Sequence, residues 1–297
     1  MDKILALYRR FLWESKDIVW IYTNQVEKLF ASRAAYMKQA QMAELDLDAS
    51  MRKELDALIV SATLASESQV ERDMWGWTVR LPFKPWGMFC GVEREGTVCA
   101  RLTRLGAEAK KDPVGSFAIQ RVSTGAPVRQ TSLIPRDTSS LYLVEQYFDE
   151  SEQLPARIAI GDGEAVMALS MPNAKWDEVA SLSQADLLAL YHKVAAEFEA
   201  AESESQTVGN SAEGQSEAAQ MIKAQFAAAK GPKTGVLYGD LKLMHEAVFY
   251  YGCRCDVEQM RQMVSSLPKS QQDELWHGVD HLDIECPRCG RNYRIER

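Results

Sequence analysis

Two short stretches near the end of the chain hold two cysteines each: GCRCD at residues 252–256 and ECPRCG at residues 285–290. The four cysteines are Cys253, Cys255, Cys286 and Cys289. Two close pairs of thiolates are typical of a tetrahedral Zn²⁺ site, in which each Zn–S bond is about 2.3 Å long. In a reducing compartment such pairs indicate a metal site before structural disulfides. The sequence therefore predicts one Zn²⁺ per chain, bound by these four cysteines.

The spacing within each pair explains how both cysteines could reach one ion. We expect Cys253 and Cys255 to lie on a strand, where residues i and i+2 face the same side. Between Cys286 and Cys289 the proline sets a turn, and Gly290 permits a positive φ, so the second cysteine can fold back toward the first. A segment this short cannot build a sufficient hydrophobic core. Its folding is therefore expected to depend on the metal.

The composition of the whole chain is that of an ordinary globular protein. Its 297 residues are 46% hydrophobic and 26% charged, and 34 basic against 42 acidic residues give a net charge of −8. This charge disfavours sequence-independent nucleic-acid binding and adsorption to anionic membranes. No apolar run is long enough to cross a bilayer, and residues 1–17 carry charges throughout, unlike a secretory signal. We expect a cytoplasmic protein that does not associate with membranes.

Residue patterns upstream of the tail predict an α+β domain with a mostly antiparallel sheet. Strands are expected at 17–23, 75–81, 87–93, 97–105, 116–122, 128–134, 156–160 and 165–171. Helices are expected at 4–13, from Thr23 or Asn24 to about residue 45, from residue 49 onward, and at 139–152. Short turns that contain glycine join several of the strands, which favours hairpins.

The rest of the chain divides into a linker and the cysteine-rich tail. We assign 1–178 to the α+β core, 179–240 to a helical and flexible linker, and 241–297 to a small zinc-binding domain. Ser183 can cap an amphipathic helix, and residues 199–217 are too polar to bury the surface that ordering requires. A short helix is expected at 218–229. It carries three large apolar side chains, Met221, Ile222 and Phe226.

The tail resembles that of the 33 kDa chaperonin family, whose members carry C-x-C and C-x-x-C pairs at a similar separation on one zinc. A second stretch, YFDESEQLP at residues 147–155, is similar to the family's YYFEQSEQIP segment. The order of an α+β domain, a helical linker and a zinc tail also matches. Segments 83–87 and 166–169 depart from the family's pattern, so the chain looks like a divergent member.

The resemblance implies a chaperone that holds unfolded client proteins without ATP and is not an enzyme. Members are inactive while reduced and zinc-bound. Oxidation of the cysteines releases zinc and unfolds the tail and linker, and active members form homodimers. Thiolates are both metal ligands and targets of oxidants, and the simplest disulfides join Cys253 to Cys255 and Cys286 to Cys289. The resemblance makes Met221, Ile222 and Phe226 the candidate client-binding residues.

Two other functions fit the same four cysteines. A zinc ribbon could bind RNA or DNA, but residues 253–297 hold seven Lys or Arg against eight Asp or Glu, so nucleic acid is not the expected partner. Alternatively, the zinc could be purely structural and have no role in a switch. An enzyme is not expected, because four cysteines close the coordination shell and the sequence lacks Ser-His-Asp, P-loop and dinucleotide-binding patterns.

Two further pairs of residues have metal- or redox-active side chains. His277 and His281 are close in sequence, but Gly278 argues against a helix that would align them, and solvated histidines are expected. Cys90 and Cys99 fall on neighbouring predicted strands. We expect them to be buried free thiols, with a disulfide between them as the alternative.

Overall fold

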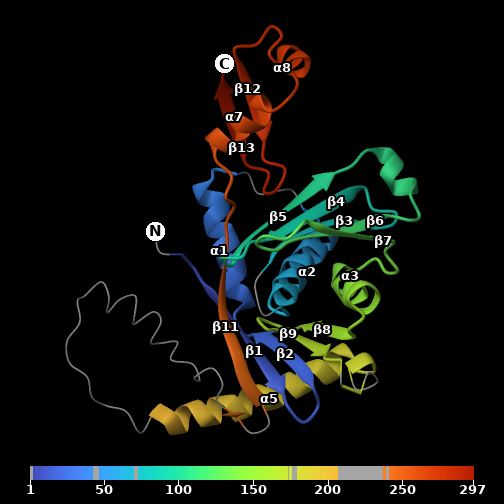
Figure 1. The fold of residues 1–297 in the computed structure, drawn as a ribbon, viewed down its shortest axis with the longest axis vertical. Coiled ribbons are helices and arrows are strands. Elements are labelled where there is room, and N and C mark those ends of the chain that lie inside the picture. Colours follow the sequence, from blue (N-terminus) through green and yellow to red (C-terminus); the bar gives the residue numbers. More distant parts are fainter. Residues whose placement is uncertain are drawn as a thin grey trace, which may run out of the picture.

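The fold is built on one large, curled sheet (Figure 1). The structure is a computed structural model that describes residues 3–42, 47–69, 73–172, 174–175, 179–206, 237–238 and 241–297. Within these residues, eleven strands form the sheet in the order β7-β6-β3-β4-β5-β11-β1-β2-β9-β8, with β10 paired to β11. The strands are β1 (Ala6–Trp13), β2 (Ile18–Thr23), β3 (Met74–Arg80), β4 (Trp86–Val92), β5 (Thr97–Arg104), β6 (Ser116–Val122), β7 (Arg129–Leu133), β8 (Ala156–Ile160), β9 (Ala165–Ser170), β10 (Leu237–Tyr238) and β11 (Leu241–Tyr251).

Helices cover the sheet and complete the predicted α+β class. They are α1 (Val26–Gln39), α2 (Ala49–Ser66), α3 (Ser140–Tyr147) and α5 (Gln184–Gln206), with short helical turns at Ala107–Lys111 and Phe148–Glu152. The described strand pairs of the sheet are antiparallel apart from β11 and β5, which run parallel. This confirms the expected mostly antiparallel sheet. The first of the long helices, α1, ends at Gln39, earlier than the predicted residue 45.

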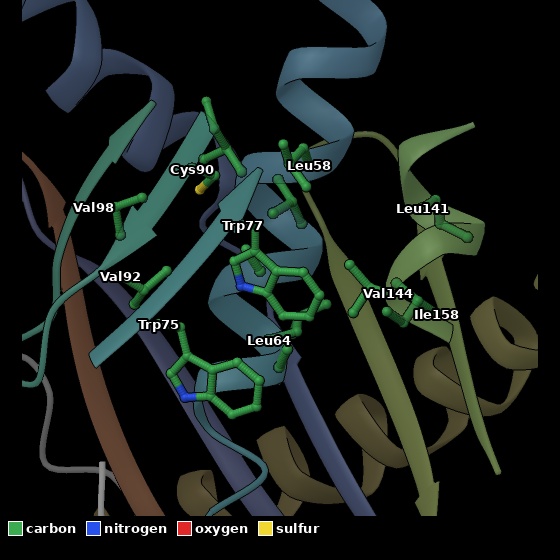
Figure 2. Packing of buried hydrophobic residues seen from close by; sticks show 14 of the residues in the cluster. Leu58, Leu64, Trp75, Trp77, Cys90, Val92, Val98, Leu141, Val144 and Ile158 are labelled. Atoms are coloured by element: carbon green, nitrogen blue, oxygen red, sulfur yellow. The ribbon is translucent and has the colours of Figure 1, made fainter. Parts of the chain in front are cut away.

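The main hydrophobic core lies between the concave face of the sheet and α2 (Figure 1). Asp48 caps this helix, because its Oδ1 accepts the Met51 backbone N–H at 2.8 Å. Figure 2 shows Trp75 and Trp77 of β3 beside Leu64 of α2. The two indole rings stack with centroids 5.5 Å apart, and both are fully buried. Large aromatic side chains of this kind contribute most to the stability of a core.

A second, smaller core lies on the other face of the sheet. There α5 packs Leu187, Tyr191 and Val194 against β2 and β9. Ser183 caps α5 as expected, with its Oγ accepting the Asp186 backbone N–H at 3.1 Å. The first part of the predicted linker is therefore a helix that packs on the sheet.

The prediction of a helix at 4–13 is wrong, because this stretch is the strand β1. It pairs with β2 on one side and with β11 on the other. Ala6 and Tyr8 alternate with less buried residues and point into the main core. The spacing of the apolar residues in 4–13 fits either a helix or a strand. The pairing with β11, which is distant in the sequence, stabilises the strand.

The strand β11 lies in the middle of the sheet, although its residues were assigned to the zinc-binding domain. It joins the two halves of the sheet, pairing Phe249 with Ala6 of β1 and Tyr250 with Thr97 of β5. The buried Tyr251 hydroxyl donates to the Ala100 carbonyl at 2.7 Å. The large sheet therefore extends past the boundary predicted at residue 241 and ends at Tyr251.

The tail beyond β11 is a small unit at one end of the molecule (Figure 1). It consists of α7 (Val257–Ser265), α8 (Lys269–Leu275) and a hairpin of β12 (His281–Glu285) and β13 (Asn292–Glu296). The predicted helix at 218–229 lies outside the described residues. Its three apolar side chains, Met221, Ile222 and Phe226, lie outside them too, and their role stays a prediction.

Candidate metal centre

The four cysteines of the tail converge on one point. Cys253 and Cys255 follow the end of β11, Cys286 follows β12, and Cys289 precedes β13. Their Sγ atoms all lie within 4.8 Å of one another, and those of Cys255 and Cys289 are 3.5 Å apart. Around an ion with bonds of about 2.3 Å, tetrahedral sulfurs stand about 3.8 Å apart. The donor set and its spacing therefore fit one tetrahedral metal ion.

The second cysteine pair sits in the turn that the sequence predicted. Gly290 has φ +81°, and its N–H donates to the Cys286 carbonyl at 2.9 Å. The Cys286 N–H in turn donates to the Arg291 carbonyl at 2.8 Å, which closes the β12–β13 hairpin. A side chain at residue 290 would be strained at this φ, so glycine is required.

The first cysteine pair is placed differently from the prediction. The β11 ladder ends at Tyr251, so Cys253 and Cys255 lie not on a strand but in the segment that leads into α7. Asp256 starts that helix by accepting the Gln259 N–H at 2.8 Å. The Tyr293 hydroxyl of β13 donates to the Cys255 carbonyl at 2.8 Å and lies 3.0 Å from Cys255 Sγ. A hydrogen bond across the tail thus fixes the pair where the strand does not.

The core domain supplies groups to the metal centre as well. The Tyr36 hydroxyl of α1 donates to Cys289 Sγ at 3.5 Å. Arg101 of β5 donates to the Cys286 carbonyl at 3.1 Å and forms an ion pair with Glu285 at 2.7 Å. Each of these contacts joins residues far apart in the sequence, and no local pattern revealed them.

A buried carboxylate strengthens this docking of the tail on the sheet. Glu93 is 7% exposed and directly follows β4. It forms an ion pair with Arg288, which lies between Cys286 and Cys289 in the cysteine knuckle, and Arg254 lies 3.6 Å from the same carboxylate. Gly91 makes room for the contact, because a Cβ there would lie 2.6 Å from an Arg288 nitrogen. The glycine at residue 91 therefore lets the Arg288 guanidinium group lie against the sheet without shifting.

The two upstream cysteines are free and buried, which confirms the expectation for them. In the β4–β5 ladder Cys90 pairs with Ala100, and Cys99 pairs with Gly91. Side chains alternate along a strand, so the two thiols point to opposite faces of the sheet. Cys90 faces the main core beside Trp77 (Figure 2), whereas Cys99 faces the tail. A disulfide between Cys90 and Cys99 is therefore excluded in this fold.

The sulfur atoms of the tail perturb one another's protonation. Hydrogen bonds from Cys253 and Cys255 lower the pKa of Cys289 to about 6. Hydrogen bonds from the neighbouring thiols, Cys253 first, hold the pKa of Cys286 far below its usual range. The pKa of Cys253 is raised in turn, with its contact to Cys255 as the main cause. The four sulfur atoms therefore lie close enough to shift one another's pKa.

The two histidines of the tail do not form a second site with each other. Gly278 has φ +75°, which agrees with the expected absence of a helix between His277 and His281. Within the described residues, His281 lies 3.7 Å from Asp283, and both side chains are well exposed. No helix in the part of the chain that the structure describes is long and apolar enough to cross a membrane.

Comparisons with known proteins agree with the geometry. The family model described as Hsp33 protein matches residues 104–296. The fold is similar to the crystal structure of the 33 kDa chaperonin, the heat shock protein 33 homolog of Thermotoga maritima, with a TM-score of 0.55 and 14% identity. That likeness covers 99% of this chain and 95% of the other, and no curated protein matches. Because the family model spans well over half of its length, the chain belongs to the Hsp33 family of chaperones.

Proposed function

We propose that the chain is a redox-regulated chaperone that holds unfolded proteins without ATP, with the tail cysteines as its switch. The observation that carries the proposal is the convergence of four thiols beside two contacts to the core, from Tyr36 to the Cys289 sulfur and from Arg101 to the Cys286 carbonyl. A chemical change at sulfur therefore acts at the contact between the tail and the core. In the reducing cytoplasm the four cysteines would hold one Zn²⁺, which supplies folding energy to the tail.

Oxidation converts the ligands into groups that cannot hold the tail together. In the simplest pairing, Cys253 joins Cys255 and Cys286 joins Cys289. The four thiols lose four electrons and four protons, and two molecules of a peroxide oxidant are reduced to four of water. A structural zinc site is worth roughly 10–16 kcal/mol, whereas a domain is stable by about 5–15 kcal/mol. The loss of all four thiolates therefore unfolds the tail.

Unfolding of the tail exposes apolar surface on both sides of the interface. On the sheet it uncovers Phe89 of β4, and in the tail it exposes Met260 and Val264 of α7. We further propose that the linker unfolds with the tail and presents Met221, Ile222 and Phe226 to unfolded clients. Flexible apolar side chains bind such clients without a fixed shape. The oxidised form is proposed to be a homodimer, as the family resemblance implies.

The docked tail gives less support to nucleic-acid binding. Arg254 and Arg288 both face Glu93, and Arg294 forms a bidentate pair with Asp283. Arginines that are engaged in ion pairs are not free to contact phosphates. The alternative of a purely structural zinc predicts the same geometry, so only an experiment separates it from the switch.

The decisive experiment compares the reduced, zinc-loaded protein with the peroxide-treated protein in the same assay. Light scattering of a chemically unfolded client is followed without ATP, and zinc is measured on the same samples. We expect aggregation to be suppressed only by the oxidised sample, and a thiol reductant with zinc to reverse the effect. Zinc release without any gain in suppression would leave the metal as a structural element and overturn the switch.

A further inference from the structure

A fifth thiol lies against the metal centre, and it comes from the core rather than from the tail. Cys99 of β5 is 1% exposed and belongs to the same apolar cluster as Cys286 and Cys289, with Cys253 and Cys255 packed against it. The alternation of β5 explains its direction, because the neighbouring even-numbered residues face the main core. Cys99 is thus presented to the tail by a rigid strand.

The parallel pairing of β11 with β5 brings Cys253 to this thiol. Tyr251 pairs with Val98, and the Gly252 N–H donates to the Val98 carbonyl at 2.8 Å. Cys99 directly follows Val98, Cys253 directly follows Gly252, and Cys253 packs against the apolar cluster to which Cys99 belongs. Gly91 leaves the space around them open, since a Cβ there would lie 3.3 Å from Cys99 Sγ. Main-chain hydrogen bonds of the sheet therefore hold the two cysteines together.

We propose that Cys99 is a fifth redox thiol, which forms a disulfide with Cys253 and ties the tail to the core sheet. In the first step Cys253 gives up its proton and its sulfur attacks a peroxide. The O–O bond breaks, Cys253 becomes a sulfenic acid, and the departing oxygen leaves as water after protonation. In the second step the Cys99 sulfur attacks the sulfenic sulfur, the S–O bond breaks, and a second water leaves. Two electrons pass from the two sulfurs to one peroxide.

The consequence of this bond rests on the proposed function. The bond counteracts the oxidative release of the tail, which is the main reaction of that function. A Cys253–Cys255 disulfide frees the tail, whereas a Cys99–Cys253 disulfide keeps the start of the tail on β5. The two bonds compete for one sulfur, and the second leaves Cys255 as a thiol. Oxidant treatment of the docked protein therefore yields a fraction of molecules whose tail stays bound to β5, and this fraction limits how much active chaperone forms. Thiol reductants break the Cys99–Cys253 disulfide and restore the reduced protein.

Tryptic mapping of the full-length protein under non-reducing conditions tests the bond directly. The sequence places Cys99 in peptide 95–101, Cys253 in 243–254 and Cys255 in 255–261, so each disulfide gives a different cross-linked mass. After peroxide treatment and alkylation, we expect peptide 95–101 joined to 243–254. Cys90, in peptide 81–94, should remain an alkylated thiol and serves as the control from the opposite face of the same hairpin. Peptide 95–101 found only in its alkylated form overturns the proposal.

Variants then separate this proposal from the proposed function. Cys99→Ala should abolish the cross-link and raise the oxidised yield of released tail at least twofold, measured as protease-accessible tail, while Cys90→Ala should change neither. A cross-link without any oxidative gain in chaperone activity would support the Cys99 bond and contradict the chaperone switch. A gain in activity without the cross-link would support the chaperone switch and contradict the Cys99 bond. The mapping of the unaltered chain needs no variant, so a poorly folded Cys99→Ala does not block the test.

Discussion

The core and the tail are held together in different ways. The core buries dozens of apolar side chains, including the stacked pair Trp75 and Trp77, between a continuous sheet and its helices. The apolar cluster of the tail has few members, and two of its buried tail residues, Cys286 and Cys289, are cysteines. Burial of about 25 cal/mol per Å² of apolar surface stabilises a large core but leaves a small one marginal. From this comparison we expect that chemistry at sulfur unfolds one region and spares the other.

The largest expected effect comes from removing one ligand. In Cys286→Ser the tail should lose its fold while the core keeps it, because only the tail depends on the four thiolates. Elemental analysis should show zinc falling from one per chain to none, and limited proteolysis should cut within 255–297 while 73–172 resists. Cys90→Ser, which alters a thiol of the main core, should keep its zinc. First cleavage within the core would contradict the contrast between the regions.

The second prediction concerns the contact between the regions. Glu93→Gln removes the charge that faces Arg288 and Arg254, and a hydrogen bond to a charged group is worth about 1.5–3 kcal/mol. The tail should therefore undock more easily, and less peroxide should release half of the zinc. Asp283→Asn is the matched control, since its pair with Arg294 is exposed and lies within the tail hairpin. Equal peroxide requirements for the two variants would show that docking does not protect the thiols.

The third prediction concerns the core alone. Burial raises the pKa of Glu145 to about 7, although the Ile158 N–H donates to its carboxyl group. The folded core then binds this proton more tightly than the unfolded chain does. The stabilisation is full below the usual pKa near 4.5 and is lost as the pH rises through about 7, for a change of about 3 kcal/mol. Urea unfolding followed by tryptophan fluorescence at pH 5 and pH 8 should show it.

Glu145→Gln supplies the control for this pH dependence. The amide oxygen can still accept from Ile158 but has no proton to lose, so its free energy of unfolding should change less between the two pH values. An unchanged difference in Glu145→Gln would assign the pH effect to another group.

The smallest expected effect is on the tail. Tyr293→Phe removes the hydroxyl that bonds to Cys255, and one hydrogen bond contributes about 0.5–1.5 kcal/mol. Zinc should pass to a competing chelator several times faster than in the unaltered protein. Tyr142→Phe, an exposed tyrosine of α3, should leave the rate unchanged. Equal rates for both variants would show that the hydroxyl does not stabilise the cysteine pair.

Local patterns predicted those parts of the fold whose geometry is set within a few residues. Gly96 and Gly163 adopt positive φ in hairpin turns that the sequence located, and Gly290 does the same in the cysteine knuckle. At each of these positions the turn needs a residue without a side chain, so sequence and structure are linked directly. The gathering of four thiols followed from their paired spacing for the same reason.

The parts that could not be predicted depend on partners distant in the sequence. Residues 4–13 are a strand because β11 pairs with them, and nothing nearby reveals that partner. Tyr36 and Arg101 look like ordinary surface residues until the tail docks on them. The position of Cys99 against the metal centre likewise comes from the pairing of β5 with β11 rather than from any spacing.

The place of β11 also bears on how the chain is made. A ribosome synthesises β1 long before β11, yet the two strands lie side by side and β11 joins both halves of the sheet. During translation the edges of β1 and β5 that pair with β11 therefore lack their partner strand until β11 has been synthesised. Such non-local pairing is slow. Closure of the sheet falls in the same short interval in which the cysteines leave the ribosome. The nascent chain therefore completes its large sheet and its four-cysteine site at nearly the same time.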